Sequence, residues 1–343
     1  MGSGRFLFSY EELLRRPKKT LNALTLLGWM GTGNLLGVFA KSAGSEIVGA
    51  LPFPMKTLSA LLLGASLSAH QLMAAASEAA LRSALVFHAP FDTTADAAFA
   101  KGDPRVYTAA DRAKRANSTP GLPPVEDTRI VADAGRFGGA LEFRRKIKPQ
   151  VFYRGGENLG YQPKHWQGAV SFWLRLDPDR DLEPGYCDPV QFVGQAWNEG
   201  NLFVEFSKDH TPRHFRFAIM AVTRFWNPQN RKWEEMPEPE RPMTAVHRPP
   251  FTRERWTHVL VTFAGINSGA ADGRGTLYLD GRKQGDFSGW NHTFNWDVSQ
   301  SAVTVGLAYV GLIDDLAVFN RELNDAEAAA LFALPRGVAG LPR

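Results

Sequence analysis

Four tryptophans of this 343-residue chain stand in polar segments with the composition of loops, where an indole ring can face a ligand instead of a core. An indole face stacks on the C–H groups of a sugar ring, and nearby Asn and Arg side chains donate hydrogen bonds to hydroxyls. The alternative is that the rings fix long loops onto the domain, because large aromatic side chains are usually well buried. The segments are RFWNPQNRKWEE and SGWNHTFNWD, and the candidate ligand-binding residues are Trp226, Asn227, Arg231, Trp233, Trp290 and Trp296.

Cysteine, serine and histidine give little indication of catalysis or metal binding. The single cysteine, Cys187, lies in GYCDP beside Asp188, and a neighbouring carboxylate raises the pKa of a thiol, so we expect a small apolar filler. No G-x-S-x-G motif is present. His210 and His214 are four residues apart, but Pro212 between them excludes a helical pair, so no zinc site is predicted there.

The distribution of charge argues against a nucleic-acid partner. The formal net charge is +4, but residues 1–76 hold seven Lys and Arg against three Asp and Glu, and the rest is balanced at 32 of each sign. Binding to phosphates needs clustered positive charge, and no such cluster follows residue 76. One cysteine also means that no intrachain disulfide holds the fold.

Residues 55–76 have the layout of a secretory signal peptide. A lysine is followed by an apolar run over 58–69 and by an A-x-A pattern at Ala74 and Ala76. The run is shorter than the roughly 20 residues of a membrane-spanning helix, which favours a cleaved signal and no stable membrane span in the mature chain. Residues 1–54 are a leader of doubtful origin: either the start is misassigned, or 21–40 forms a glycine-broken membrane segment.

The body from about residue 77 to 343 has the pattern of an all-β domain. In GAVSFWLRLDP the residues Val170, Phe172, Leu174 and Leu176 alternate with polar or outward positions, which gives one core face. Similar alternation appears in NLFVEFS, HFRFAIM, WTHVLVTF and GTLYLDG, and the Asp-Gly pair in LDGR predicts a tight hairpin. After the last strand, the spacing of Asn324 and Glu327 predicts a capping box and a short C-terminal helix.

The order of these motifs resembles the laminin-G-like, concanavalin A-like lectin and glucanase family. The motifs are ALVFHAPFD, GRFGGALEF, VSFWLRLDP, RWTHVLVTF, LYLDGRKQG and VGLIDDLAVFNRELNDAEAAALF, over about 84–334. The resemblance implies a two-sheet antiparallel jelly-roll β-sandwich in which the first and last strands pair. It also implies functions that range over glycan binding, protein adhesion and structural roles, so the fold alone does not settle function.

Two long segments, 96–134 and 178–250, depart from short members of that family and are candidate functional loop insertions, because loops carry function on rigid scaffolds. Glucanases of this fold carry their catalytic acids in an E-x-D-x-x-E string, and none is present: Glu199 and Glu205 are six positions apart. Catalysis is therefore not expected, unless acids converge from different loops.

The strand GLIDDLAVF places two adjacent aspartates in an apolar setting. With Leu316 and Val318 facing the core, alternation predicts Asp314 on the core side and Asp315 on the other side with Ile313. A buried carboxylate needs a partner. The resemblance implies that Asp92 lies nearby and that Asp92, Asp314 and Asp315 bind a structural calcium, the alternative being hydrogen bonds to backbone N–H groups.

These observations favour a secreted or periplasmic, non-catalytic module that binds a polysaccharide or other glycan, or a cell-surface protein. A divergent carbohydrate-active enzyme on the same sandwich and a structural cell-envelope protein remain alternatives. A cleft with two carboxylates would favour the enzyme, whereas a groove with exposed tryptophans would favour the binding module.

We expect export to remove the chain up to about Ala76 because of the signal layout that precedes it. N-terminal sequencing of the exported protein should begin near Ser77. Accumulation of a stable, unprocessed protein that still begins at Met1 would contradict the prediction.

Overall fold

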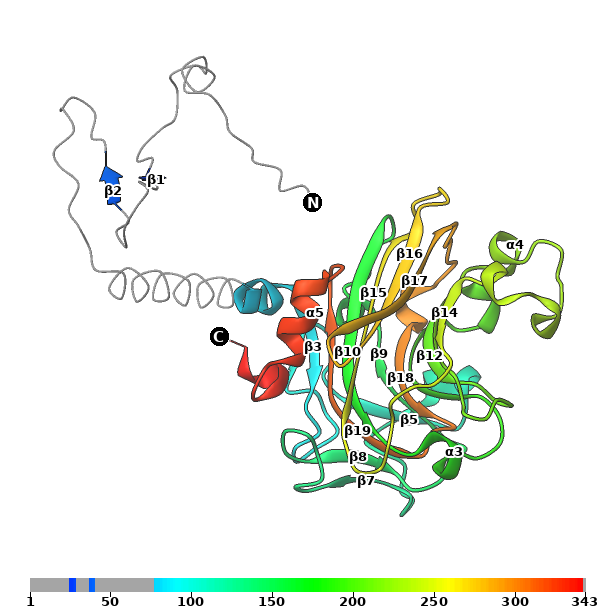
Figure 1. Ribbon diagram of the computed structural model, residues 1–343. Helices are drawn as coiled ribbons and strands as arrows, with labels where there is room; N and C mark the ends of the chain where they lie inside the picture. The colour runs from blue at the N-terminus through cyan, green and yellow to red at the C-terminus, as the bar shows by residue number, and fades with distance from the viewer. Residues whose placement is uncertain (1–24, 29–36, 41–76, 342–343) are drawn as a thin grey trace. The chain divides into compact units, whose positions relative to one another are not determined.

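The computed structural model describes residues 25–28, 37–40 and 77–341 (Figure 1). The chain divides into two units, residues 1–73 and 74–343. In the first, β1 (Thr25–Gly28) pairs antiparallel with β2 (Gly37–Ala40). The predicted signal segment 55–76 lies outside the described residues, as does 1–54 apart from these two strands. Within the described ranges, no helix is long and apolar enough to cross a membrane.

The second unit is a sandwich of two antiparallel sheets, which confirms the predicted fold class. The central strands of the first sheet run in the order β17 (Arg282–Trp290), β16 (Gly273–Leu279), β15 (Thr257–Ile266), β10 (Trp166–Arg175), β19 (Gly311–Phe319), β3 (Leu85–Ala89) and β4 (Phe99–Ala100), with β8 (Ala140–Phe143) pairing both β19 and β7 (Thr128–Val131). The second sheet runs β14 (Met243–Val246), β13 (Phe215–Met220), β12 (Asn201–Phe206), β11 (Cys187–Val193), β18 (Ala302–Leu307), β9 (Gln150–Arg154), β5 (Val106–Ala109) and β6 (Thr119–Pro120).

The helices of this unit are short. Residues 77–84 are helical, and the C-terminal helix is α5 (Asp325–Phe332). The remaining turns of helix are α3 (Pro178–Asp181), α4 (Thr223–Trp226), η1 (Arg112–Asn117), η2 (Gly156–Leu159), η3 (Trp197–Glu199), η4 (Trp233–Glu235), η5 (Glu238–Glu240), η6 (Val298–Gln300) and η7 (Gly337–Gly340).

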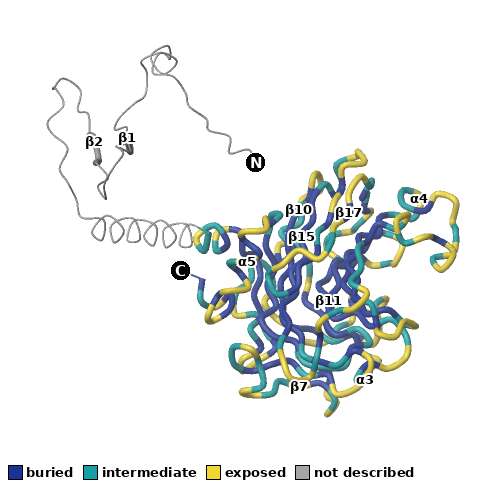
Figure 2. The backbone as a smooth tube through the Cα atoms, in the orientation of Figure 1, coloured by how far each residue is buried: buried dark blue, intermediate teal, exposed yellow. Residues whose placement is uncertain are grey.

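Alternation along the strands builds the core between the sheets. Val170, Phe172 and Leu174 of β10 are buried in it, as predicted, and meet Phe192 and Val204 from the second sheet in the same cluster. Figure 2 shows the buried strands at the centre of the sandwich. The two segments that the sequence indicated as loop insertions also hold strands of the second sheet, including β11 to β14 within 178–250.

Local signals at the turn and the helix are confirmed. The β16–β17 hairpin turns at Asp280 and Gly281, whose φ angles are 50° and 71°, because both central residues of such a turn need a positive φ. In the capping box, the Asn324 side chain accepts a bond from the Glu327 N–H at 3.0 Å, and Glu327 Oε2 accepts from the Asn324 N–H at 3.1 Å.

The strand β19 contains a bulge that interrupts the predicted alternation of sides at the two aspartates. Its partner β10 advances two residues, from Ser171 to Trp173, while β19 advances three, from Ala317 to Asp314. Asp315 has a φ of 52°, and Ile313 therefore shares the core between the sheets with Leu316. The expectation that Ile313 lies opposite Leu316 was wrong because strict alternation does not hold through a bulge.

The bulge gives both carboxylates partners on neighbouring segments. Asp315 Oδ1 lies 2.6 Å from His88 Nε2 of β3, and Asp315 Oδ2 accepts a bond from the Val338 N–H at 2.9 Å. Asp314 Oδ2 accepts bonds from the backbone N–H groups of Arg136 at 2.6 Å and Phe137 at 3.1 Å. The two aspartates of β19 therefore bond to strand β3, to the segment at residues 136–137 and to the C-terminal segment at Val338.

Asp314 nevertheless has an unfavourable place for a charge. Its Oδ1 atom is buried with no hydrogen-bond partner in the described part of the chain. Burial, and then the neighbouring carboxylate of Asp315, raise the pKa of Asp314 from the ordinary 3.8 to about 7. A carboxyl group with a raised pKa stabilises the fold fully only below its unfolded-state pKa, and this contribution is lost as the pH rises through 7.

We expect Asp314→Asn, which stays neutral, to gain stability relative to the wild type as the pH rises from about 4 to above 7. The shift in the pKa corresponds to a difference of up to roughly 4 kcal/mol in the free energy of unfolding. Urea unfolding of both proteins across this range measures it. If the free energies of unfolding of the two proteins changed in parallel with pH, Asp314 would ionise in the folded protein as it does in the unfolded chain.

Candidate ligand-binding site

A pocket of about 320 Å³ opens on the outer face of the second sheet, the face turned away from the core. Aromatic side chains make up most of its wall, and carboxyl groups lie among them. The lining residues are Tyr186, Asp188, Trp197, Phe203, Glu205, Met220, Trp226, Trp233 and Glu234.

Strand alternation places the floor of the pocket. Val204 and Phe206 of β12 face the core, so Phe203 and Glu205 face outward. On β13, Met220 likewise points outward and packs with Phe203 in a small apolar cluster that also includes Ala218 and Met243, with Trp226 and Trp233 against it. The pocket is thus held by a second, smaller core on the outside of the sheet.

The segment after β13 supplies two tryptophans that the sequence singled out. Trp226 and Trp233 are half-buried, with ring centres 5.9 Å apart and planes at 74°. Asn227 fixes this loop: its Nδ2 donates to the Arg231 carbonyl at 2.8 Å, and its Oδ1 accepts from the Arg231 N–H at 3.0 Å. The Arg231 guanidinium pairs with Glu240, so Asn227 and Arg231 shape the loop and do not line the pocket.

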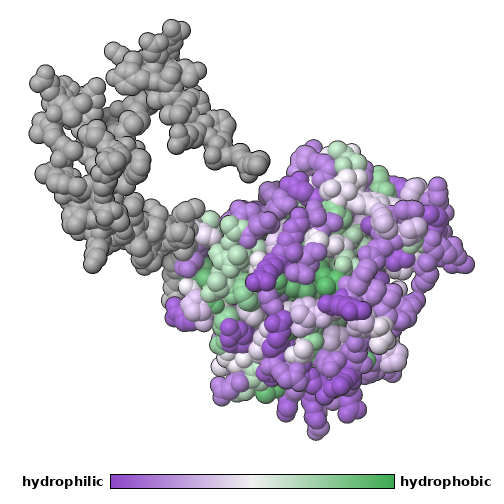
Figure 3. Space-filling model, viewed as in Figure 1, coloured by the Kyte–Doolittle hydropathy of each residue, from purple (hydrophilic) through white to green (hydrophobic). Residues whose placement is uncertain are grey.

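A third tryptophan was not predicted. Trp197 of η3 is 53% exposed, and with Val125 and Phe332 it is one of the three large apolar side chains that are exposed in the described part of the chain. Figure 3 shows that hydrophilic side chains cover most of the face in view. An exposed indole at the rim of a pocket is a feature of binding sites more than of folding cores.

The other long segment, 96–134, reaches the same face through η1. The guanidinium of Arg115 donates to the carbonyl oxygens of Gly194 and, at 2.8 Å, Gln300, which anchors this turn beside the sheet. Burial lowers the pKa of Arg112, while the charges of Asp188 and Glu199 oppose this shift, so all three groups lie close enough to interact. Segment 178–250 therefore supplies the residues that line the pocket, and η1 of segment 96–134 is anchored beside the same sheet.

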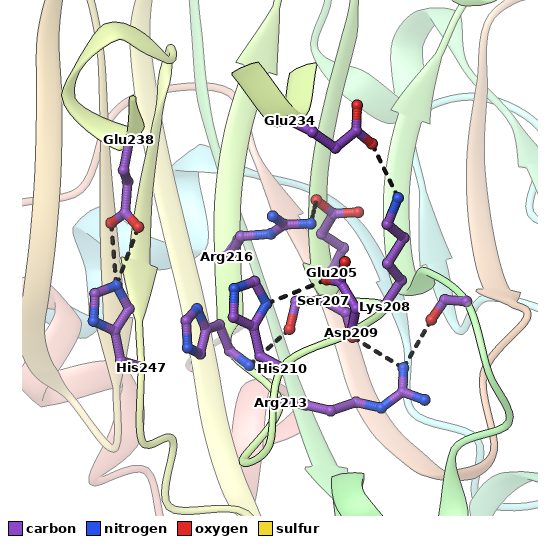
Figure 4. Close-up of polar contacts among 12 residues, drawn as sticks. Glu205, Ser207, Lys208, Asp209, His210, Arg213, Arg216, Glu234, Glu238 and His247 are labelled. Atoms are coloured by element: carbon purple, nitrogen blue, oxygen red, sulfur yellow. Dashed lines mark hydrogen bonds and ion pairs between the residues drawn. The ribbon is translucent and has the colours of Figure 1, made fainter. Parts of the chain in front are cut away.

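The floor of the pocket holds a buried charge cluster (Figure 4). Arg216 Nη2 lies 2.5 Å from Glu205 Oε1, and both side chains are more than nine-tenths buried. Gln191 Nε2 donates to Asp188 Oδ2 at 2.5 Å. Burial raises the pKa of Asp188, and the adjacent Glu205 raises it further.

The rim is also charged. Lys208 Nζ bonds Glu234 Oε1 at 2.9 Å, which links the β12–β13 turn to the tryptophan loop (Figure 4). Arg241 lies 4.4 Å from the centre of the Trp233 ring, a cation–π contact that holds this ring from one side.

The other predicted ligand-binding tryptophans do not line this pocket. Trp296 stacks on Tyr161 at 5.9 Å, contacts Trp166 at 5.5 Å, and donates from Nε1 to the Gly200 carbonyl at 2.8 Å. Trp290 packs against the core between the sheets. Both have the loop-fixing position that was the alternative for these rings.

The predicted calcium residues lie on the first sheet. Asp314 and Asp315 have the hydrogen bonds described above, and Asp92 Oδ1 accepts from the Gly139 N–H at 3.3 Å. Among the residues with described positions, no group of three or more His, Cys, Asp or Glu side chains is arranged to hold a metal ion. Calcium at this place stays a prediction.

The histidines and the cysteine have structural surroundings. The rings of His210 and His214 stack at 3.8 Å, and His214 stacks on His247 at 4.4 Å, so the three rings form a row and do not converge on a point. Cys187 is buried, and burial raises the pKa of its thiol to about 11. A thiol with this pKa is a poor nucleophile.

Sequence reasoning missed the charged floor, which consists of Asp188, Glu205 and Arg216. The available signal was a charged residue inside an otherwise apolar strand, as in NLFVEFS, HFRFAIM and CDPVQFV. Such a residue must have a buried partner, but the partner lies on a neighbouring strand whose register the sequence alone does not reveal.

Comparison with known proteins gives a family match for part of the chain. Residues 167–329 match the family model Laminin_G_3, described as the concanavalin A-like lectin/glucanases superfamily. No curated protein matches the chain.

Among solved structures, domain 4 of AbnA, a GH43 extracellular arabinanase from Geobacillus stearothermophilus, in complex with arabinotriose, is similar at 14% identity. The match covers 71% of this chain and 96% of that one, with a TM-score of 0.44. The ligand binding domain of botulinum neurotoxin serotype D, in complex with N-acetylneuraminic acid, matches at 10% identity, 78% and 56% coverage and a TM-score of 0.47.

The binding domain of Paraclostridial Mosquitocidal Protein 1 matches at 14% identity, 74% and 52% coverage and a TM-score of 0.41. The chain thus spans little more than half the length of both toxin domains. Residues 167–329, which hold most strands of the sandwich, thus match the concanavalin A-like lectin/glucanases superfamily, and the two-sheet antiparallel sandwich agrees with that match.

Proposed function

We propose that the protein is an exported, non-catalytic module that binds a glycan in the pocket on the outer face of the second sheet. The observation that carries the proposal is the set of tryptophans, Trp197, Trp226 and Trp233, around a polar floor. Export rests on the signal layout of residues 55–76.

The shape and chemistry of the pocket suit a sugar. Its volume of about 320 Å³ lies at the lower end of the range for small-ligand sites, which fits one or a few sugar rings better than a folded partner. The planes of Trp226 and Trp233 meet at 74°, so a sugar ring that stacks on the face of one indole would lie beside the edge of the other. Asp188, Glu205 and Glu234 line the pocket beside these rings, so carboxyl groups are present to bond sugar hydroxyls.

The paired acids make a carbohydrate-active enzyme the second candidate, because two carboxyl groups share one pocket. Hydrolysis with retention needs carboxyl groups about 5–5.5 Å apart, and inversion needs about 6.5–9.5 Å. Gln191 already donates to Asp188 Oδ2, and Arg216 pairs with Glu205, so both carboxyl groups have partners within the floor. This geometry favours binding over hydrolysis.

The alternative of a structural cell-envelope protein predicts a different use of the tryptophans. A cell-envelope protein without a ligand needs no exposed indole at a pocket rim, and it would use Trp226 and Trp233 only to fix their loop. Binding and stability measurements on the same variants separate these functions.

We expect Trp197→Ala, Trp226→Ala and Trp233→Ala to weaken binding to the best ligand on a glycan array by about tenfold or more. Trp197→Ala should leave the melting temperature nearly unchanged because this ring is 53% exposed. Trp296→Ala is the matched control: it should keep the affinity while lowering stability by roughly 1–4 kcal/mol through lost aromatic packing.

Unchanged affinity in all three pocket variants, with stability lowered in Trp226→Ala and Trp233→Ala, would leave the structural function. Hydrolysis of an array glycan that is lost in Asp188→Asn would establish the enzyme instead.

A further inference from the structure

The two carboxyl groups at the floor of the pocket have too few donors between them. Asp188 and Glu205 lie on the neighbouring strands β11 and β12, and both line the pocket. Gln191 donates to Asp188 Oδ2, and Arg216 pairs with Glu205 Oε1. Asp188 Oδ1 is buried, and no N–H or O–H donor in the described part of the chain reaches it.

This arrangement favours a retained proton. Ionised carboxylates only accept hydrogen bonds, so the buried Asp188 Oδ1, which no donor reaches in the described part of the chain, is better accommodated when the pair keeps one proton. Two negative charges on adjacent strands of one buried pocket floor would also repel each other.

Nearby cations do not remove this requirement. Arg216 is already paired with Glu205, and Lys208 is held at the rim by Glu234. Arg112 is half-buried on η1, and the charges of both Asp188 and Glu199 act to raise its pKa against the effect of burial. Burial and Glu205 outweigh Arg216 and Arg112, so the pKa of Asp188 lies well above its ordinary value.

We propose that Asp188 and Glu205 share one proton at neutral pH, and that this acid pair makes the pocket selective for uncharged sugars. The inference rests on the proposed function and names the ligand class of the same site.

The selectivity follows from what the floor offers to a ligand. With Asp188 protonated and Glu205 paired to Arg216, no unpaired charge remains there for a uronate or an amino sugar, and burying an unpaired ionic group is costly. A hydroxyl group both donates and accepts hydrogen bonds, so it matches both a protonated carboxyl group and a carboxylate in the pocket lining.

The shared proton also couples binding to pH. Above the pKa of the pair, Asp188 ionises and the floor gains a second negative charge. The affinity for an uncharged sugar then falls by up to tenfold for each pH unit, the limit for loss of one proton.

The first experiment measures binding of neutral, uronic-acid-containing and amino-sugar-containing oligosaccharides from about pH 6 to about pH 9. We expect the neutral sugars to bind best and to lose affinity as the pH rises. Asp188→Asn keeps a neutral donor beside Glu205 but removes the proton that titrates, so the affinity that it retains should stay flat as the pH rises. Asp286→Asn, an exposed change on β17, is the control and should follow the wild type.

The second experiment detects the proton directly by infrared spectroscopy of the C=O stretch of a protonated carboxyl group. It is made in the Asp314→Asn background because Asp314 also retains a proton near neutral pH. The band should be present at neutral pH, fade as the pH rises, and be absent when Asp188→Asn is added. If Asp188→Asn does not fold, the shared proton is tested by the pH dependence of sugar binding and of the infrared band in the Asp314→Asn protein alone.

The outcomes separate the inference from the proposed function. A protonated-carboxyl band that persists unchanged in Asp188→Asn, or neutral-sugar affinity that is flat with pH, overturns the shared proton while glycan binding stands. Preference for uronates or amino sugars overturns the selectivity. Absence of binding to any glycan overturns the proposed function, and it removes the selectivity with it.

Discussion

Each strand of a two-sheet sandwich has one face in the core and one face outside, and the rest of this structure depends on that division. The inner faces of β10, β12 and β15 are filled by Val, Leu and Phe, which leaves the alternate positions to be exposed, covered or paired. On the first sheet, α5 and the C-terminal segment cover the outer face with Leu331, Leu334 and Val338. On the second sheet, loops build a partial cover, and the gap in this cover is the pocket.

Much of the fold was predictable because its strands, its hairpin turn and its C-terminal helix are specified by local sequence patterns. Alternation in GAVSFWLRLDP and WTHVLVTF gave the strands, the Asp-Gly pair gave a hairpin, and the capping residues gave the start of α5. The bulge at Asp315 was not predictable, since it depends on pairing between β10 and β19 and reverses the side of Ile313. Local signals therefore fix elements, whereas register is decided by contacts between segments far apart in the chain.

The candidate site was only partly predictable for the same reason. Trp226 and Trp233 stood out because tryptophan is unusual in so polar a loop, and the structure places both in the pocket wall. Trp290 and Trp296 gave the same signal but pack inward, because sequence composition does not show which way a loop folds back. Asp188 and Glu205 are seventeen positions apart, and only the antiparallel pairing of β11 and β12 brings them together.

The His88–Asp315–Val338 contact brings the beginning and the end of the sandwich to one place on the first sheet, while the pocket opens from the outer face of the second. A linker attached at either end of the sandwich would therefore leave from the first sheet, on the side away from the pocket, and would leave the mouth of the pocket uncovered.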